Sequence, residues 1–270
     1  MEGTHPEEAK LSSAASSARD RVRQKVSEAE WHTRVELAAL YRALHHFGMT
    51  ELIANHITAR VPGEPEHMLL NAYGLMYDEI TASNLYKIDM DGKVIMEPEG
   101  GFPLNATGYV IHGAIHSVRH DVEVVIHTHT RAGIAVSAMK CGLLPLSQHS
   151  VILGEVSYHD FQSPALDFDE RQSIIDDMGD TDLMILRNHG LMVCGSSIAQ
   201  AFSNIFRLET ACRIQVDALS GGAENAMALN SSHFQATRNL VLPHVIEASA
   251  KLQWEAVRRM LERSGAVVDA

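Results

Sequence analysis

Two short apolar runs constrain the fold of this 270-residue chain more than any other feature. Residues 122–126, interrupted by a single glutamate, and residues 183–186 have the length of strands and are far too short to cross a membrane. Helical periodicity lies on both sides of the first run, at residues 107–119 and 131–139, and follows the second run at residues 198–220. Because helices alternate with short buried strands, the sequence predicts an α/β domain.

The chain divides into three predicted regions. Residues 1–28 are rich in serine and alanine and carry few apolar anchors, which predicts a flexible N-terminal tail. Residues 29–222 contain the alternating helices and strands, and residues 223–270 predict a helical C-terminal extension. Within the central region the pattern also predicts a helix from residue 31 to Gly48, strands at 53–60 and 68–71, and a hairpin at 88–95.

The charge balance and the cysteines indicate the protein's surroundings and partners. Twenty-two Lys and Arg residues against 34 Asp and Glu residues give a net charge of −12, which argues against binding to nucleic acid or to anionic membranes. The N-terminus lacks the apolar segment of a signal peptide, and the three cysteines lack CxxC spacing. We therefore expect a cytoplasmic protein with reduced thiols and no nucleic-acid or membrane partner.

The strongest chemical signal is the sequence His127-Thr128-His129, directly after the first apolar run. Residues i and i+2 of a strand point to the same face, so His127 and His129 can direct two imidazoles to one point. This arrangement suits a divalent metal, with zinc as the first expectation and iron(II), manganese or cobalt as alternatives. A pair of polar residues that cap the strand is the other interpretation.

A third histidine extends this pattern. His189 lies in an Asn-His-Gly turn after the second apolar run, and Gly190 allows the backbone to turn tightly there. Catalytic zinc sites typically combine three protein ligands with one open position. The sequence therefore predicts a metal site formed by His127, His129 and His189, provided that the two turns meet in space.

Other polar residues allow weaker interpretations. His112 and His116 are one helical turn apart, which suits metal ligands but also an ordinary amphipathic helix. Arg131 follows the histidine pair and can hold a substrate carboxylate, although a structural ion pair is an equal alternative. The chain has no GxGxxG, Walker A, GxSxG or HExxH sequence, so the corresponding enzyme classes are not predicted.

Six segments, in order along roughly residues 31–222, together resemble the class II aldolase/adducin family, most of all the adducin head domain and its bacterial relatives. They are NHITAR (55–60), NAYGLMYDEITAS (71–83), HTHT (127–130), AVSAMKCGLLP (135–145), GEVSYHD (154–160) and LRNHG (186–190). The resemblance implies a three-layer α/β/α domain around a mixed, mostly antiparallel sheet. It also implies a homotetramer with sites at subunit interfaces, and metal binding by His127, His129 and His189.

The sequence departs from sugar-phosphate aldolases at two places. These aldolases carry an acidic residue, the general acid/base, where this chain has Gly108, four residues before His112. Their phosphate pocket uses a glycine that matches Gly74, but Tyr73 and Ala106 replace small hydroxyl residues. We therefore do not expect a phosphorylated substrate.

These observations predict a metal-dependent lyase, aldolase-like or a decarboxylase, that acts on a small non-phosphorylated oxo or hydroxy acid. Decarboxylation fits the missing acid/base best, because no proton need be removed before the C–C bond breaks. The expected substrate-binding residues are Asn55, Tyr73, Gly74 and Arg131, and the candidate proton donors are His112, Gln148 and His149.

Two alternatives stay open on the sequence alone. The first is an iron(II)-dependent oxygenase or decarboxylase of an aryl 2-oxo acid, because an oxygenase of aminocoumarin antibiotic synthesis resembles this chain around the Asn-His-Gly turn. The second is a non-catalytic, adducin-like module that binds actin and spectrin, because adducin heads retain the same histidine motifs.

Overall fold

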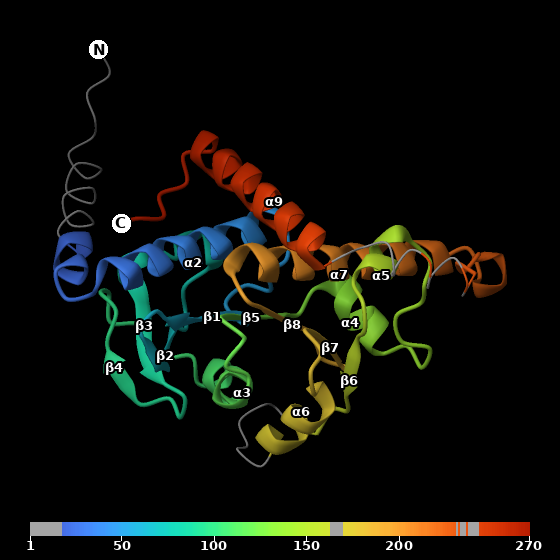
Figure 1. The fold of residues 1–270 in the computed structure, drawn as a ribbon, viewed down its shortest axis with the longest axis horizontal. Coiled ribbons are helices and arrows are strands. Elements are labelled where there is room, and N and C mark those ends of the chain that lie inside the picture. The colour runs from blue at the N-terminus through green and yellow to red at the C-terminus, as the bar shows by residue number, and fades with distance from the viewer. Residues whose placement is uncertain (1–17, 163–169, 231, 233–235, 237–242) are drawn as a thin grey trace.

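An eight-stranded sheet forms the centre of the computed structural model, which describes residues 18–162, 170–230, 232, 236 and 243–270 (Figure 1). In sheet order the strands are β4 Val94–Met96, β3 Leu85–Asp89, β2 Glu64–Asn71, β1 His56–Val61, β5 Val124–Thr128, β8 Gly190–Gly195, β7 Leu183–Leu186 and β6 Ser157–His159. Every neighbouring pair is antiparallel except β6 and β7, which are parallel. The predicted mixed, mostly antiparallel sheet is therefore confirmed.

Helices cover both faces of this sheet (Figure 1). One face carries α2 Glu28–His46, α4 Arg131–Ser137, α5 Gln148–Ile152, α7 Ile198–Leu219 and α9 Pro243–Arg263, and the other carries α3 Ala106–Val118 and α6 Glu170–Met178. Each face of the sheet has its own hydrophobic core, and consecutive residues of β5 point alternately into one core and the other, as the two-residue period of a strand requires. Val124 and Ile126 belong to the core under α2 and α7, whereas Val125 packs with α3 and α6. The predicted three-layer α/β/α fold is confirmed.

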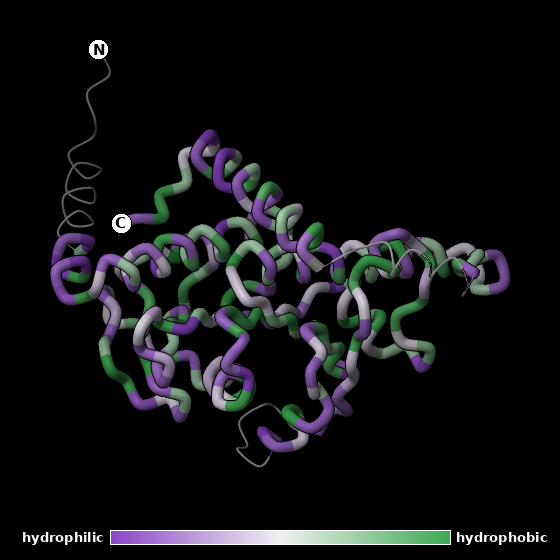
Figure 2. Tube along the Cα trace, in the orientation of Figure 1, coloured by the Kyte–Doolittle hydropathy of each residue, from purple (hydrophilic) through white to green (hydrophobic). Residues whose placement is uncertain are grey.

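The hydropathy of the trace agrees with these layers (Figure 2). The central strands are mainly hydrophobic, whereas α9 alternates hydrophilic and hydrophobic turns along its length. Trp254 of α9 is 7% exposed, packs against Phe202 of α7, and donates its indole N–H to Glu36 of α2. The predicted C-terminal helix thus packs on the domain. Among the described residues, no helix is both long and apolar enough to cross a membrane.

The N-terminal region differs from the prediction of a tail over residues 1–28. Residues 1–17 lie outside the described part, but Val22 is buried with Trp31 and Ala82. Arg21 also forms a bidentate ion pair with Glu99. Residues 18–28 therefore pack against the domain. These contacts come from a few scattered side chains, among them Arg19, Val22 and Val26, which is too sparse a pattern to predict the packing from the sequence.

The turn between β7 and β8 fits closely against the end of β5. Asn188 has a φ of 57°, a left-handed conformation that asparagine tolerates better than most residues. Gly190 pairs within the sheet so near to β5 that a Cβ atom at this position would overlap the carbonyl oxygen of Thr128. The Asn-His-Gly sequence therefore fixes both the conformation of this turn and its distance from β5.

We expect Gly190→Ala to destabilise the protein by about 2 kcal/mol or more, because the new methyl group must displace the backbone at Thr128. Gly221→Ala is the matched control, since no atom lies within 4 Å of the Cβ position there. The free energy of unfolding is measured by urea denaturation of both variants. Equal stabilities of the two variants would contradict this description of the turn.

Candidate metal centre

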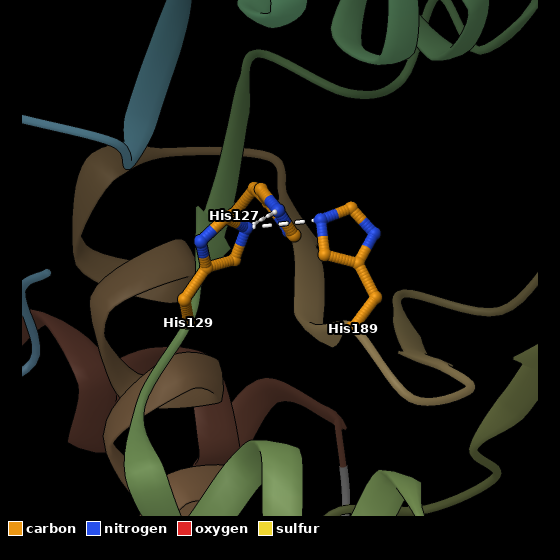
Figure 3. Close-up of side chains that lie close together, drawn as sticks. All are labelled: His127, His129 and His189. Atoms are coloured by element: carbon orange, nitrogen blue, oxygen red, sulfur yellow. Dashed lines mark hydrogen bonds between the residues drawn. The ribbon is translucent and has the colours of Figure 1, made fainter. Parts of the chain in front are cut away.

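Three histidines converge where β5 ends beside the β7–β8 turn (Figure 3). His127 belongs to β5, His129 follows it by two residues, and His189 comes from the turn. The Nε2 atoms of His127 and His129 are 2.7 Å apart, and those of His129 and His189 are 2.9 Å apart. The structure thus brings together the three residues that the sequence proposed as metal ligands.

Hydrogen bonds at Nδ1 fix the orientation of two of these rings. Nδ1 of His127 is 3.0 Å from the carbonyl oxygen of Leu191, and Nδ1 of His129 is 2.7 Å from a carboxylate oxygen of Glu51. Because a carbonyl and an ionised carboxylate can only accept, both Nδ1 atoms carry the proton. In the neutral rings, the Nε2 lone pairs then face the point of convergence, as in metal sites whose histidines are held by outer hydrogen bonds.

The surroundings also favour neutral rings. Burial, followed by the neighbouring His56, His129 and His189, holds the pKa of His127 well below its usual range. Burial lowers the pKa of His189 to about 4, with His129 acting in the same direction and Glu51 opposing it. Both imidazoles are therefore in the form that binds a metal at neutral pH.

The donor set fits a divalent metal. The Nε2 atoms of His127 and His129 lie 2.7 Å apart, a separation at which two facing lone pairs repel unless a cation lies between them. The candidate ligand atoms of the three histidines all lie within 4.8 Å of one another, and around a tetrahedral zinc with bonds of about 2.0 Å they would be roughly 3.3 Å apart. The observed separations bracket this value, so the three side chains fit a metal with three protein ligands.

The three candidate proton donors lie at different places. His112 is fully buried on α3, and its Nε2 is 3.0 Å from Nδ1 of His56, which in turn neighbours His127. Gln148 and His149 begin α5, which packs against α7. Within the described part of the chain, neither of these two has a hydrogen bond or ring contact with the three histidines, so the structure connects only His112 to the site.

Asn55 shapes the site indirectly. It is fully buried, and its side-chain oxygen accepts a hydrogen bond of 2.7 Å from the backbone N–H of Glu51. Its amide nitrogen has no hydrogen-bond partner among the described residues. Asn55 therefore holds the loop that carries Glu51, and through Glu51 it acts on His129.

The remaining expected substrate-binding residues are more exposed. Tyr73 is 45% exposed, and Gly74, with a φ of 103°, lies next to it against the ring of Phe102. Arg131 is exposed at the start of α4 and lines a surface cavity with Glu209 and Arg213. None of the three histidines lines that cavity, and no hydrogen bond among the described residues joins Arg131 to them.

Sequence reasoning missed two neighbours of the site, Glu51 and His56. Glu51 lies in an exposed loop and belongs to no motif, so nothing in the sequence distinguishes it. His56 lies directly across from His127 in the pairing of β1 with β5, and the two ring centroids are 5.0 Å apart. His56 belongs to the NHITAR segment, which resembles the family. Its position beside His127 depends on a strand register that the sequence does not reveal.

The comparisons with known proteins agree with this fold. Residues 35–216 match the family described as Class II Aldolase and Adducin N-terminal domain. The chain belongs to this family.

Three relatives illustrate the similarity. A Pseudomonas aeruginosa protein, named provisionally as an aldolase class 2 protein, is 52% identical over 204 residues, which cover 75% of this chain and 78% of the relative. The crystal structure of an aldolase II superfamily protein from Pseudomonas syringae superposes with a TM-score of 0.86 at 46% identity, covering 92% of this chain and 99% of that one. Rat alpha-adducin is 40% identical over 243 residues, which are 86% of this chain but 33% of the adducin.

We expect the double substitution of His127 and His129 by alanine to abolish stoichiometric metal, because it removes two of three converging ligands. Elemental analysis after loading with zinc and desalting measures the metal content per chain. The exposed His120, replaced by alanine, is the matched control and should leave the content unchanged. One zinc per chain in the double variant would overturn the assignment of the ligands.

We also expect Glu51→Gln to weaken zinc binding about tenfold or more, because the charged partner of His129 is lost while an acceptor of the same shape stays. Competition with a chromophoric chelator measures the Kd. Glu66→Gln removes an exposed carboxylate elsewhere and serves as the control. If the two variants bind zinc equally, Glu51 does not tune the site.

Proposed function

We propose that this protein is a metal-dependent carbon–carbon lyase, aldolase-like or a decarboxylase, that acts on a small non-phosphorylated oxo or hydroxy acid. The observation that carries the proposal is the convergence of three Nε2 atoms, on His127, His129 and His189, with the Nδ1 protons of two rings already engaged. Membership in the class II aldolase/adducin family supports a lyase of this kind.

The proposed chemistry divides between the metal and the chain. When bound, a divalent metal supplies a Lewis acid that stabilises the enolate left when a C–C bond breaks. Leu191 and Glu51 hold the two ring planes of the HxH pair in position for this, so little reorganisation is needed on binding. The position of Gly108 offers no carboxylate as acid/base, which favours decarboxylation because no proton has to be removed first.

The loop at Gly74 supports a substrate without a phosphate. The ring of Phe102 borders this glycine, since a Cβ atom on Gly74 would lie 3.4 Å from it, and the preceding residue is the exposed Tyr73. Aromatic rings give a phosphate neither charge nor N–H donors, which phosphate sites ordinarily provide.

The metal, the assembly and the location belong to the same proposal. Zinc is the first expectation for a site of three neutral imidazoles, with iron(II), manganese and cobalt as alternatives. We propose a homotetramer in the cytoplasm with sites at subunit interfaces, an arrangement in which a partner subunit can supply the carboxylate-binding group that Arg131 does not provide within one chain. The net charge of −12 favours a small substrate over nucleic acid or a membrane.

The test is turnover by the metal-loaded protein. We expect it to release carbon dioxide or an aldehyde from members of a panel of small 2-oxo, 3-oxo and hydroxy acids, and not from phosphorylated sugars of the same length. The double alanine variant of His127 and His129 should be inactive, while His120→Ala stays active. Activity confined to phosphorylated sugars, or equal activity in the double variant, would refute the proposal.

A second candidate is an adducin-like binding module, which the 40% identity to alpha-adducin favours. Since this chain spans about a third of the adducin's length, the activities of the whole adducin do not follow from the match. Co-sedimentation with actin and spectrin distinguishes the two functions. The iron oxygenase is less favoured, because Glu51 contacts Nδ1 of His129 and so does not complete a site of two histidines and one carboxylate.

A further inference from the structure

His56 lies against Gly108 of α3, a position without a side chain. A Cβ atom on Gly108 would lie 3.3 Å from Cβ and Cγ of His56 and 2.9 Å from Leu70. His56 is also paired with His127 across β1 and β5, so both side chains lie on the same face of the sheet. The imidazole of His56 therefore lies between α3 and the metal centre.

A chain of buried hydrogen bonds begins behind His56 at Arg60, which is 6% exposed. Nη2 of Arg60 is 3.3 Å from Nδ1 of His116. A guanidinium group can only donate, so Nδ1 of His116 accepts and its Nε2 carries the proton. That Nε2–H donates to the hydroxyl oxygen of Thr58, 2.9 Å away.

The same logic continues to His56. The hydroxyl of Thr58 accepts from His116 and donates to Nδ1 of His112, 2.9 Å away. Nε2 of His112 then carries the proton and donates to Nδ1 of His56, 3.0 Å away. The reverse direction would point an N–H of His116 at a guanidinium that has no lone pair. Donation from Arg60 favours this direction, in which His56 carries its proton on Nε2. A backbone hydrogen bond of His116 with Val122, which raises the pKa of His116, favours the opposite direction, and the tautomer measurement below decides between the two.

This outer proton has no acceptor within the described part of the protein. Among the described residues, no hydrogen bond involves Nε2 of His56. This atom is also not one of the fully buried polar atoms that lack a partner. A polar N–H in such a place is available to a ligand of the neighbouring metal centre.

We propose that His56 donates a hydrogen bond from Nε2 to an oxygen atom of the small acid bound at the metal centre, and that Arg60, His116, Thr58 and His112 position this donor. The inference rests on the proposed function for the kind of ligand. His56 thus supplies a hydrogen bond to the ligand on the side of the site where Gly108 has no side chain.

The contact requires no proton transfer. A neutral imidazole N–H that faces a developing negative charge stabilises it as a fixed dipole, and its orientation is set before the ligand arrives. Arg60 is well held for this purpose, because its guanidinium also donates to the backbone carbonyl groups of Pro65, His116, Arg119 and Val122.

The first test is the tautomeric state in the wild-type protein, which requires no variant that might fail to fold. Long-range ¹H–¹⁵N NMR spectra of the zinc-loaded protein report which ring nitrogen carries each proton. We expect Nε2–H tautomers for His56, His112 and His116, and the same pattern in Arg60→Lys, since lysine also only donates. An Nδ1–H tautomer at His56 would overturn the inference.

The second test measures binding of oxalate, a planar dicarboxylate that chelates divalent metals, to the zinc-loaded protein by calorimetry. His56→Gln can place an amide N–H near the position of Nε2, whereas His56→Asn reaches only as far as Nδ1. We expect His56→Asn to bind oxalate about tenfold more weakly or worse, since a hydrogen bond to a charged acceptor is lost, and His56→Gln to recover most of the affinity.

The zinc affinity of both variants separates this role from others. We expect it to equal that of the wild type, because His56 is proposed as a donor to the ligand and not as a fourth metal ligand. Weaker zinc binding in both variants, equal oxalate binding by His56→Asn and the wild type, or no oxalate binding by the wild type would each refute the inference. Oxalate binding that depends on His56 in a protein without lyase activity would refute the proposed function alone.

Discussion

The pairing of β5 with β1 on one side and with β8 on the other is the constraint on which the site depends. The β1 pairing places His56 opposite His127, and the β8 pairing brings the turn that carries His189 to the end of β5. A shift of one residue in the β1–β5 register would place His56 and His127 on opposite faces of the sheet, and a shift in the β5–β8 register would move the turn of His189 along β5. The positions of the histidines in the metal centre therefore depend first on the register of the strands.

Much of this arrangement is readable in the sequence because its signals are local. Once a strand is assumed, the HxH spacing places both histidines on one face, and the glycine of the Asn-His-Gly sequence predicts a tight turn. The close approach of Gly190 to the backbone of Thr128 is seen only in the structure. The alternation of short apolar runs with helical patterns likewise indicates the layers. These features need no knowledge of the tertiary structure, which is why the fold class and the HxH pair could be expected from the residues alone. That His189 meets this pair in space was expected only from the resemblance to the class II aldolase/adducin family.

The other residues around the site could not be predicted in this way, because closeness in the sequence does not determine closeness in space. Arg131 comes two residues after His129, but it starts α4 and lines a cavity with Glu209 and Arg213 of α7. Glu51 is 78 residues from His129 and still accepts its Nδ1–H. Gln148 and His149 have suitable chemistry, but α5 carries them to the layer of α7. Each case is decided by where an element packs, which composition and spacing do not encode.

The buried chain of polar side chains from Arg60 to His56 lowers the stability of the fold, because these groups lose their solvation. Burial holds the pKa of His112 well below its usual range and lowers that of His116 to about 3, so these rings stay neutral and lose their solvation without gaining a charge. Apolar residues on α3 and β1 would fill the same volume without needing exact hydrogen-bond partners. What such residues could not do is transmit the donor direction of Arg60 across the sheet to a ring beside His127. The sequence thus keeps a polar interior between α3 and β1, where the direction of the hydrogen bonds bears on the site.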